Sequence, residues 1–434
     1  MIYPVHHIKY VTVVTLIASV LFFTPDISMA EVSDPTRREG RETNSVNLEE
    51  CIKAAIENNL QIAAARNGLG IAEADRIKAS LLFPSNPKVQ SKVGSRSTPA
   101  DRMTDYSVSL FQELQVYGQR RKRINVSNKK IEKVKLEIAD VERTVIAKVK
   151  TGFYEVLTAR DILSLRENVN SIFERLWDAT RERYNAGAIA ALELNSIKIG
   201  YGQARQQLLV AKNNYKNRLL NLKLLLGKPG DEVLNIEGKL YSEKLLISKE
   251  DLLASAYGKR PDLKAIEFEK ERASQEILLR KVEIIPNPSV SGFFSREEGD
   301  NVIVGGQVYF SIPIWDRKQP ELKRARTARD TAGINIKYKQ LEIQKEVETA
   351  FQTFMAAKEG IAIYTDEIIP QVDESLSLNE ISYRDGNTSF IEFLTMQKNL
   401  LETRATYINT LLDYNKAIIN IETVSGERLI SNDR

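Results

Sequence analysis

The residue types that most often carry enzyme chemistry are almost absent from this chain. Histidine occurs only at His6 and His7, and cysteine only at Cys51, in a sequence of 434 residues. If an N-terminal signal is removed, no histidine remains, which excludes His-based acid–base catalysis, a Ser-His-Asp triad and a His/Cys zinc site. Neither GxxxxGK[ST] nor GxGxxG, the patterns of phosphate-binding loops, is present. We therefore expect a protein that is not an enzyme and holds no metal or cofactor.

The first thirty residues are organised like a secretory signal peptide. Lys9 precedes an apolar run from Val11 to Phe23, and the small-x-small sequence Ser28-Met29-Ala30 follows. The run is about 13 residues long, whereas a spanning helix needs roughly 20; an uncleaved membrane anchor is the alternative. We expect a signal peptide over residues 1–30, cleavage after Ala30, and an N-terminal extension over residues 31–47.

Two roles are open for Cys51. A lipid-anchored cysteine would follow the cleavage site directly, but twenty residues separate Cys51 from Ala30. A free cysteine otherwise packs as a small apolar residue, and Leu48 and Ile52 are suitable neighbours on a helix. We expect the packing role and no lipid anchor.

Composition and charge narrow the class of protein. The chain has 62 Lys and Arg against 58 Asp and Glu, a net charge of +4, so no global excess of positive charge predicts nucleic-acid binding. With 42% hydrophobic residues it can bury a large apolar surface. A local basic run, Arg120–Arg123, is expected either at a membrane interface or in a polar tunnel, because an exported chain does not meet nucleic acid.

The sequence contains one pattern twice. Seven residues recur at a spacing of 199 without a gap: Tyr184, Gly187, Glu193, Arg205, Tyr215, Asn221 and Gly227 correspond to Tyr383, Gly386, Glu392, Arg404, Tyr414, Asn420 and Gly426. Upstream, three recur at a spacing of 198: Val149, Thr151 and Phe153 correspond to Val347, Thr349 and Phe351. We therefore define a first copy (residues 48–227) and a second copy (249–426), joined by residues 228–248 and followed by a tail, 427–434.

Each copy has the same order of predicted elements. A helical stretch (48–82 and 249–284) ends before a proline, which cannot donate a helical N–H. After two strands, two long helices meet around a Tyr-x-x-Gly sequence, and the helix from Gln119 to Arg183 would extend roughly 100 Å. Apolar residues in these helices recur at spacings typical of coiled coils. They are Ile131, Val134, Ile138, Val141 and Val145, and then Ile336, Ile343, Val347, Phe351 and Phe354.

The predicted strands, at about 87–97, 103–114, 288–296 and 301–314, alternate apolar and polar residues. In the last of them one face has Val302, Val304, Gly306, Val308, Phe310 and Ile312, and the other has Asn301, Gly305, Gln307, Tyr309 and Ser311. About ten residues is the length of a membrane-spanning strand. Four strands cannot close a barrel, and open edges are not tolerated in lipid, so several chains would share one barrel. The alternative is a small soluble sheet with one buried face.

Together these features resemble the TolC-type outer-membrane efflux channels. The shared motifs are Asn86-Pro87 and Asn287-Pro288, the strand-to-helix exits LFQELQVYGQRRKR and YFSIPIWDRKQPEL, and the hairpin sequences RYNAGAIAALEL and SYRDGNTSFIEF. The resemblance implies a mainly α fold with membrane β: a long coiled-coil α-helical barrel continuous with a trimeric 12-stranded outer-membrane β-barrel. Each chain would give four strands and be internally duplicated.

The resemblance also implies a function. The protein would be a passive trimeric exit duct in the outer membrane of a Gram-negative bacterium, with a long periplasmic portion, that exports cations, metals or drugs. Its partners would be two further copies, outer-membrane lipid, a periplasmic adaptor and an inner-membrane pump of the RND type; no nucleic acid is implied. Glu193, Glu392 and the PIWDRKQ segment favour the heavy-metal cation branch. The alternatives are a type I secretion exit channel and a periplasmic coiled-coil adaptor or scaffold without a barrel.

Finally, the resemblance implies sites at the two helix reversals. Glycine accepts the positive φ that a reversal requires. The implied adaptor-docking tips are Gly187, Ala188, Ile189, Leu192, Glu193, Gly386, Asn387, Thr388 and Ile391, and the implied periplasmic aperture residues are Glu392, Thr395, Tyr383, Arg384 and Asp385. Thr395 stands where the family has a second acidic residue, so a threefold ring of Glu392 would be the only carboxylate ring there. The helix–strand junctions are expected at Pro84, Pro87, Pro286 and Pro288. Ordinary tight turns and a solvated helix end are the alternatives.

Overall fold

The computed structural model describes residues 45–97, 99, 102–241, 245–298, 301–385 and 387–427. The predicted signal peptide, with His6 and His7, lies outside the described residues. So do most of the predicted extension, Gly386 and residues 428–434 of the tail.

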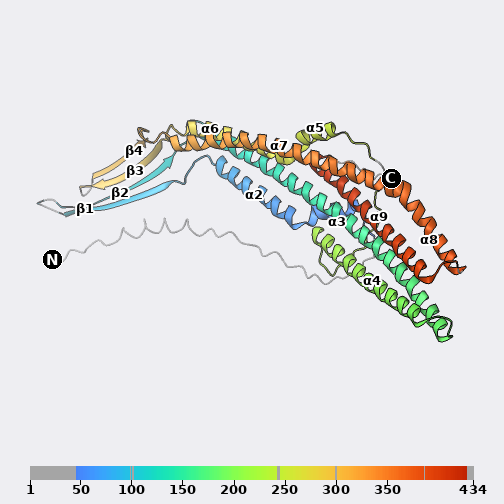
Figure 1. The fold of residues 1–434 in the computed structure, drawn as a ribbon. Coiled ribbons are helices and arrows are strands. Elements are labelled where there is room, and N and C mark those ends of the chain that lie inside the picture. Colours follow the sequence, from blue (N-terminus) through green and yellow to red (C-terminus); the bar gives the residue numbers. More distant parts are fainter. Residues whose placement is uncertain are drawn as a thin grey trace, which may run out of the picture. The chain divides into compact units, whose positions relative to one another are not determined.

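The elements follow the predicted order in both copies (Figure 1). The first copy contains α1 (Leu48–Asn58), α2 (Leu60–Ser80), β1 (Lys88–Ser97), β2 (Arg102–Glu113), α3 (Gln119–Asn185) and α4 (Ala191–Leu225). The second contains α5 (Lys249–Lys259), α6 (Pro261–Val282), β3 (Ser289–Glu297), β4 (Asn301–Tyr309), α7 (Gln319–Ile363), the π-helix η2 (Tyr364–Ile368), α8 (Ile369–Arg384) and α9 (Phe390–Ser425). Each predicted N-terminal helical stretch is thus two helices with a break between them.

At each of the two breaks a side chain donates a hydrogen bond to a carbonyl of another helix, but the two side chains differ in type. Asn59, between α1 and α2, donates from Nδ2 to the carbonyl oxygen of Leu225 at 2.7 Å. Arg260, between α5 and α6, donates to the carbonyl oxygen of Val424 at 3.4 Å and pairs with Asp262 at 2.6 Å. Both acceptors lie in the last turn of the helix that closes the copy, and carbonyls there have no partner within the helix.

The long helices pack along the predicted seams. Helix α3 runs for 67 residues without interruption, against α2, α4 and α6, while α7 packs against α6 and α9. Of the predicted seam residues, Val145 is buried in one core cluster, beside Val149 and Phe153, and Ile343, Val347 and Phe354 are buried in a second. The other predicted seam residues are half-buried. Cys51 is fully buried in the first cluster, and burial raises the pKa of its thiol to about 12, so its predicted packing role is confirmed. No helix within the described ranges has the length and apolar character needed to span a membrane.

The four strands form one antiparallel sheet in the order β1-β2-β3-β4. The register pairs Val93 with Tyr106 and Val108 with Phe294, so apolar residues of neighbouring strands share a face, as predicted. The larger members of this exposed face are Val89, Val93, Tyr106, Val108, Leu110, Phe294, Val302, Val304 and Val308. Strands β1 and β4 each have one neighbour among the described strands, so each leaves one edge open.

Strand β4 ends at Tyr309, so the prediction of strand up to residue 314 is wrong at this end. Tyr309 pairs with Ser289, the first residue of β3, so the residues that follow have no partner strand. Pro313 also lacks the N–H that a ladder requires. The segment after Tyr309 therefore continues as an irregular connection to α7.

Candidate functional site

The first hairpin reverses at a glycine-terminated helix end. The N–H of Ala188 donates to the Arg183 carbonyl, and that of Gly187 to the Tyr184 carbonyl, both at 2.9 Å, which is a Schellman motif. Gly187 has φ of 74°, and a Cβ there would meet nothing within 4 Å. The backbone conformation, rather than packing, therefore requires this glycine.

The second hairpin closes with the same long-range bond. The N–H of Asn387 donates to the Ser382 carbonyl at 2.9 Å, and the hydroxyls of Ser382 and Thr388 lie 2.5 Å apart. Asp385 is the exposed C-cap of α8. The side chain of Arg384 lies outside the described part of the chain, so its predicted aperture role stays a prediction.

Glu392, the predicted aperture carboxylate, takes part in a capping box at the start of α9. Its Oε2 accepts from the Ser389 hydroxyl at 2.7 Å and from the Ser389 N–H at 3.0 Å, and its own N–H donates to the Ser389 Oγ at 3.3 Å. The hydroxyl and then the N–H of Ser389 hold the pKa of Glu392 below its ordinary value. This exposed carboxylate is therefore ionised at neutral pH and held in place by its own helix. Thr395, one turn further on, donates its hydroxyl to the Ile391 carbonyl at 2.8 Å.

The start of α4 in the first hairpin has no such cap. Its N-cap is Ala190, which has no side-chain acceptor, although Glu193 lies at the same position as Glu392. The carboxylate of Glu193 is instead close to Tyr383 of the second hairpin, where its charge contributes to raising the pKa of the tyrosine.

Tyr383 connects the two hairpins. Its ring stacks on Phe393 with the centroids 4.7 Å apart, next to the buried Ile197 of α4. Burial raises the pKa of the Tyr383 hydroxyl, and a hydrogen bond from Arg183 of α3 opposes that rise. One side chain therefore touches α9 and meets polar groups of α3 and α4. The aperture role that the resemblance implies for Tyr383 stays a prediction.

Two buried amides that the sequence did not suggest lie behind Tyr383. Asn379 of α8 donates from Nδ2 to the Phe393 carbonyl at 3.1 Å and to Gln397 Oε1 at 3.4 Å, and both amide side chains are buried. A cavity of about 310 Å³ separates this cluster from α3, where Arg175 and Leu176 line it. The only available signal was that polar residues stand at apolar positions of the helical repeat.

The predicted junction prolines lie at the boundaries of helices and strands. Pro84 and Pro286 follow α2 and α6, and Pro87 and Pro288 directly precede β1 and β3. In the second copy the Asn287 side chain accepts from Gln119 at 2.9 Å and donates to Glu113 at 2.7 Å. This Asn-Pro pair therefore joins the end of β2 to the start of α3.

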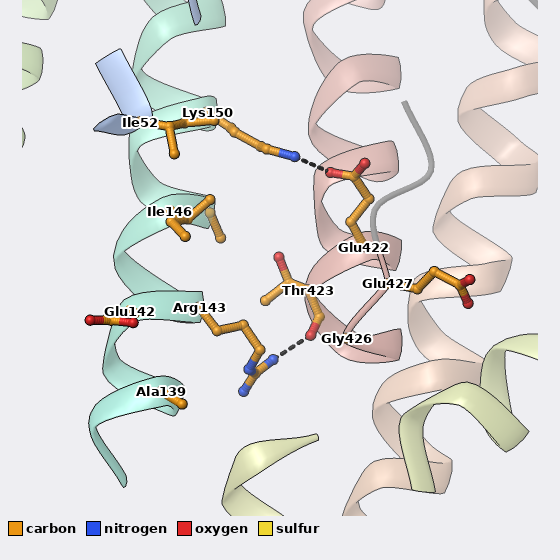
Figure 2. A pocket seen from close by; sticks show the side chains of 11 residues that line it. Ile52, Ala139, Glu142, Arg143, Ile146, Lys150, Glu422, Thr423, Gly426 and Glu427 are labelled. Atoms are coloured by element: carbon orange, nitrogen blue, oxygen red, sulfur yellow. Dashed lines mark hydrogen bonds and ion pairs between the residues drawn. The ribbon is translucent and has the colours of Figure 1, made fainter. Parts of the chain in front are cut away.

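A second cavity, of about 360 Å³, lies where α1, α3 and α9 meet (Figure 2). Lys150 of α3 forms an ion pair with Glu422 of α9 at 2.6 Å, and both side chains are largely buried. Arg143, about two turns before Lys150 on α3, donates to the Thr423 carbonyl (Figure 2). These contacts join the two copies. Over the ranges that the structure covers, no group of three or more His, Cys, Asp or Glu could hold a metal ion.

Comparison with known proteins identifies the family. The family model described as "Outer membrane efflux protein" matches residues 51–228 and 252–427, close to the two copies. The chain belongs to this family. Outer membrane efflux proteins are transport proteins and not enzymes, so the prediction of a non-enzyme is confirmed at the level of the family.

Several known proteins are similar to this chain at low sequence identity. Outer membrane protein TolC of Vibrio cholerae is 20% identical over 401 residues, which cover 88% of this chain and 90% of the relative. TolC of Escherichia coli is 21% identical over 307 residues, but these cover 66% of this chain and 62% of that protein, less than two thirds of its length. Nodulation protein T of Rhizobium leguminosarum bv. trifolii is 21% identical, and the match covers 58% of this chain and 56% of that protein.

Solved structures show the same fold. The structure of CusC superposes with a TM-score of 0.69 at 17% identity and covers 88% of this chain and 92% of its own. The outer membrane channel CmeC of Campylobacter jejuni superposes with a TM-score of 0.69 at 16% identity, covering 93% and 94%. The predicted fold class, a duplicated helical and strand architecture of the TolC type, is confirmed.

Proposed function

We propose that this protein is the outer-membrane exit channel of a tripartite efflux system. Three copies assemble, each supplying four strands to a 12-stranded barrel and its long helices to a periplasmic tunnel. The channel is passive and is coupled to an inner-membrane pump of the RND type through a periplasmic adaptor. Cations, metals or drugs are its cargo.

The sheet carries this proposal. One face is apolar and exposed along all four strands, and the outer edges of β1 and β4 are open. Backbone N–H and C=O groups cannot be left unpaired in hydrocarbon, so an edge that faces lipid must pair with another chain. Membership in a family of outer membrane efflux proteins supports the same assembly.

Fractionation and cross-linking of the expressed protein test this assembly. We expect the processed protein in the outer-membrane fraction, as a trimer that forms ion-conducting pores in planar bilayers. A soluble periplasmic monomer that forms no pores would refute the proposal.

The hairpin tips are proposed as the aperture and the docking surface. The exposed, ionised Glu392 supplies one negative charge per subunit, and Tyr383 holds α8 and α9 to the first hairpin. Leu192 and Ile391, 73% and 59% exposed at the two turns, offer apolar side chains to an adaptor.

Three substitutions separate these roles. Glu392→Gln keeps a capping group and removes the charge, so we expect lower cation selectivity in reversal-potential measurements with unchanged trimer assembly. Tyr383→Phe keeps the ring stack and removes the hydroxyl, and we expect a larger resting conductance. Leu192→Glu should reduce adaptor capture by severalfold and leave both electrical properties unchanged. An unchanged reversal potential in Glu392→Gln would remove this residue from the aperture.

A further inference from the structure

The connections from sheet to helix carry exposed aromatic and basic side chains in both copies. Tyr117 lies between β2 and α3 and is 49% exposed, and Trp315 lies between β4 and α7 and is 87% exposed. Exposed arginines accompany them in the connection or in the first turns of the following helix. We call this set the junction belt, and it consists of Tyr117, Arg120, Arg121, Trp315, Arg317 and Arg324.

The arginines of the belt lack acidic partners. Elsewhere, some cations of the long helices are paired, as Lys150 is with Glu422 and Arg166 is with Glu402. Arg120 donates from Nε to the Ser80 carbonyl oxygen at 2.8 Å, but among the described residues no carboxylate forms an ion pair with Arg120, Arg121, Arg317 or Arg324.

The position of Arg120 and Arg121 is also unfavourable within the chain itself, whereas α7 has Glu321 in its first turn. Helix α3 has no acidic residue in its first turn, where Arg120 and Arg121 lie. Positive charges at this end of a helix are repelled by the helix dipole. An external anion would remove this cost, so the arrangement favours a negatively charged ligand.

The aromatic residues indicate that this anion lies at a boundary between hydrocarbon and water. Tryptophan and tyrosine concentrate at the boundary between hydrocarbon and water, where an apolar ring and a polar edge are both satisfied. The belt continues directly from the apolar face of the sheet, through Leu110 on β2 and Val308 on β4, which are 54% and 65% exposed. A ligand with an anionic head and an apolar tail fits both parts.

We propose that the junction belt binds the anionic headgroups of phospholipids in the membrane leaflet nearest the helices. This inference rests on the proposed outer-membrane location. The arginines bind the phosphate and the negatively charged headgroup, and the aromatic rings lie at the level of the ester groups. The acyl chains cover the apolar face of the sheet.

Lipid titration of the purified full-length protein in neutral detergent tests the proposal. Native mass spectrometry would compare phosphatidylglycerol with phosphatidylcholine of the same acyl chains, at low and high salt. We expect roughly tenfold tighter binding of phosphatidylglycerol at low salt, because the arginines attract the net negative charge of its headgroup. The preference should weaken at high salt.

Variants then assign the preference to the belt. Arg120→Gln with Arg121→Gln, and Arg317→Gln with Arg324→Gln, should each reduce it severalfold, whereas the lysine substitutions Arg120→Lys with Arg121→Lys should keep most of it. The matched control, Lys198→Gln with Lys216→Gln, removes two exposed charges from α4 and should leave the preference unchanged.

Inorganic phosphate distinguishes a lipid from a free anion, because it lacks the apolar part. Equal binding of the two lipids, retention of the preference in the glutamine variants, or displacement of lipid by millimolar phosphate would each overturn the proposal. If a glutamine variant no longer forms trimers, the test is whether the unmodified protein loses its preference for phosphatidylglycerol at high salt. A preference that salt does not weaken would then overturn the proposal. Bilayer conductance is measured in parallel: a conducting protein without lipid preference refutes the belt alone, whereas a non-conducting soluble protein refutes the proposed function.

Discussion

The two copies differ most in the helix that leads to each hairpin tip. In the first copy, α3 reaches its tip as one uninterrupted helix of 67 residues. In the second copy, the π-helix η2 separates α7 from α8, and Pro370 follows in the first turn of α8. The same sequence pattern has therefore produced one continuous arm and one interrupted arm.

A single residue explains the difference. Residues before the interruption, such as Phe153 and Phe351, correspond at a spacing of 198, whereas Tyr184 and Tyr383 correspond at 199. The second arm thus contains one extra residue between these points, and a π-helical turn accommodates one extra residue without changing the phase of the flanking helix. The irregularity at η2 therefore keeps both tips in register.

Single-residue deletions give the largest contrast between the arms. Deleting Asn168 from α3 would rotate everything beyond it by about 100° and expose Val169 and Phe173, so we expect loss of the trimer and more than about 5 kcal/mol of destabilisation. Deleting Thr365 from η2 should restore a regular helix in phase on both sides, with a change of no more than about 1–2 kcal/mol.

Both deleted side chains are exposed, so the comparison isolates helix phase from lost contacts. Thermal unfolding followed by circular dichroism, with trimer content from gel mobility, measures both effects. Equal damage from the two deletions would show that η2 does not hold the extra residue.

Alanine substitution of the glycines that end the two copies should also change the free energy of unfolding unequally. A Cβ on Gly227 would lie 2.3 Å from the backbone oxygen of Asn58, whereas one on Gly426 would lie 3.4 Å from the Cβ of Lys259. Both have positive φ, 67° and 68°. We expect Gly227→Ala to lose about 3 kcal/mol or more, from strain and a backbone clash, and Gly426→Ala to lose about 1–2 kcal/mol from strain alone.

Thermal denaturation of the two alanine variants, side by side, checks this order. The reverse order would mean that α1 yields to the added methyl group more readily than α5 does.

Exchanging the helix caps should reverse a smaller difference. Ser389→Ala removes the acceptor of the capping box and should destabilise the second hairpin by about 1 kcal/mol. Ala190→Ser supplies the missing acceptor opposite Glu193, and should stabilise the first hairpin by a similar amount. Hydrogen exchange at the two tips measures both, and the double variant should differ little from the parent. A Ser at 190 that gave no added protection would show that Glu193 is committed to Tyr383.

The smallest expected effect is a pH dependence confined to the second hairpin. The pKa of Glu392 is lowered in the folded protein, so its stabilising contribution is complete above the ordinary value near 4.5 and is lost as the pH falls through the lowered value. Relative to Glu392→Gln, the parent should therefore lose its advantage in thermal midpoint as the pH falls below the ordinary pKa of a glutamate. In a Ser389→Ala background this pH dependence should shrink, because the hydroxyl is lost while the backbone N–H of residue 389 remains, and an undiminished dependence would assign it to another group.

Much of this fold could be predicted because periodicity and duplication are properties of the sequence. The spacing of Val145 and its neighbours gave the seam of α3, and the alternation around Val304 gave the apolar face of β4. Gly187 marked a turn because its backbone conformation excludes most other residues.

The remaining features depend on partners that are distant in sequence. The end of β4 is set by where β3 begins, and the role of Glu392 depends on Ser389, which is absent from the first copy. The buried pair Asn379 and Gln397 left only a weak signal, polar residues at apolar positions of the repeat, because its hydrogen bond is made between two helices. η2 was visible only as a change of spacing from 198 to 199 that no local propensity indicates.

The helix breaks have an evolutionary consequence. Asn59 and Arg260 occupy the same place in the two copies, yet one is a short amide and the other a long guanidinium, and each donates to a carbonyl 199 residues from its counterpart. After the gene duplicated, the carbonyl in each copy still required a hydrogen-bond donor, while the residue that supplied the donor was free to change. At this position the two halves share the need of a backbone carbonyl for a donor and not the residue that supplies it, so a comparison of residue identity misses the correspondence.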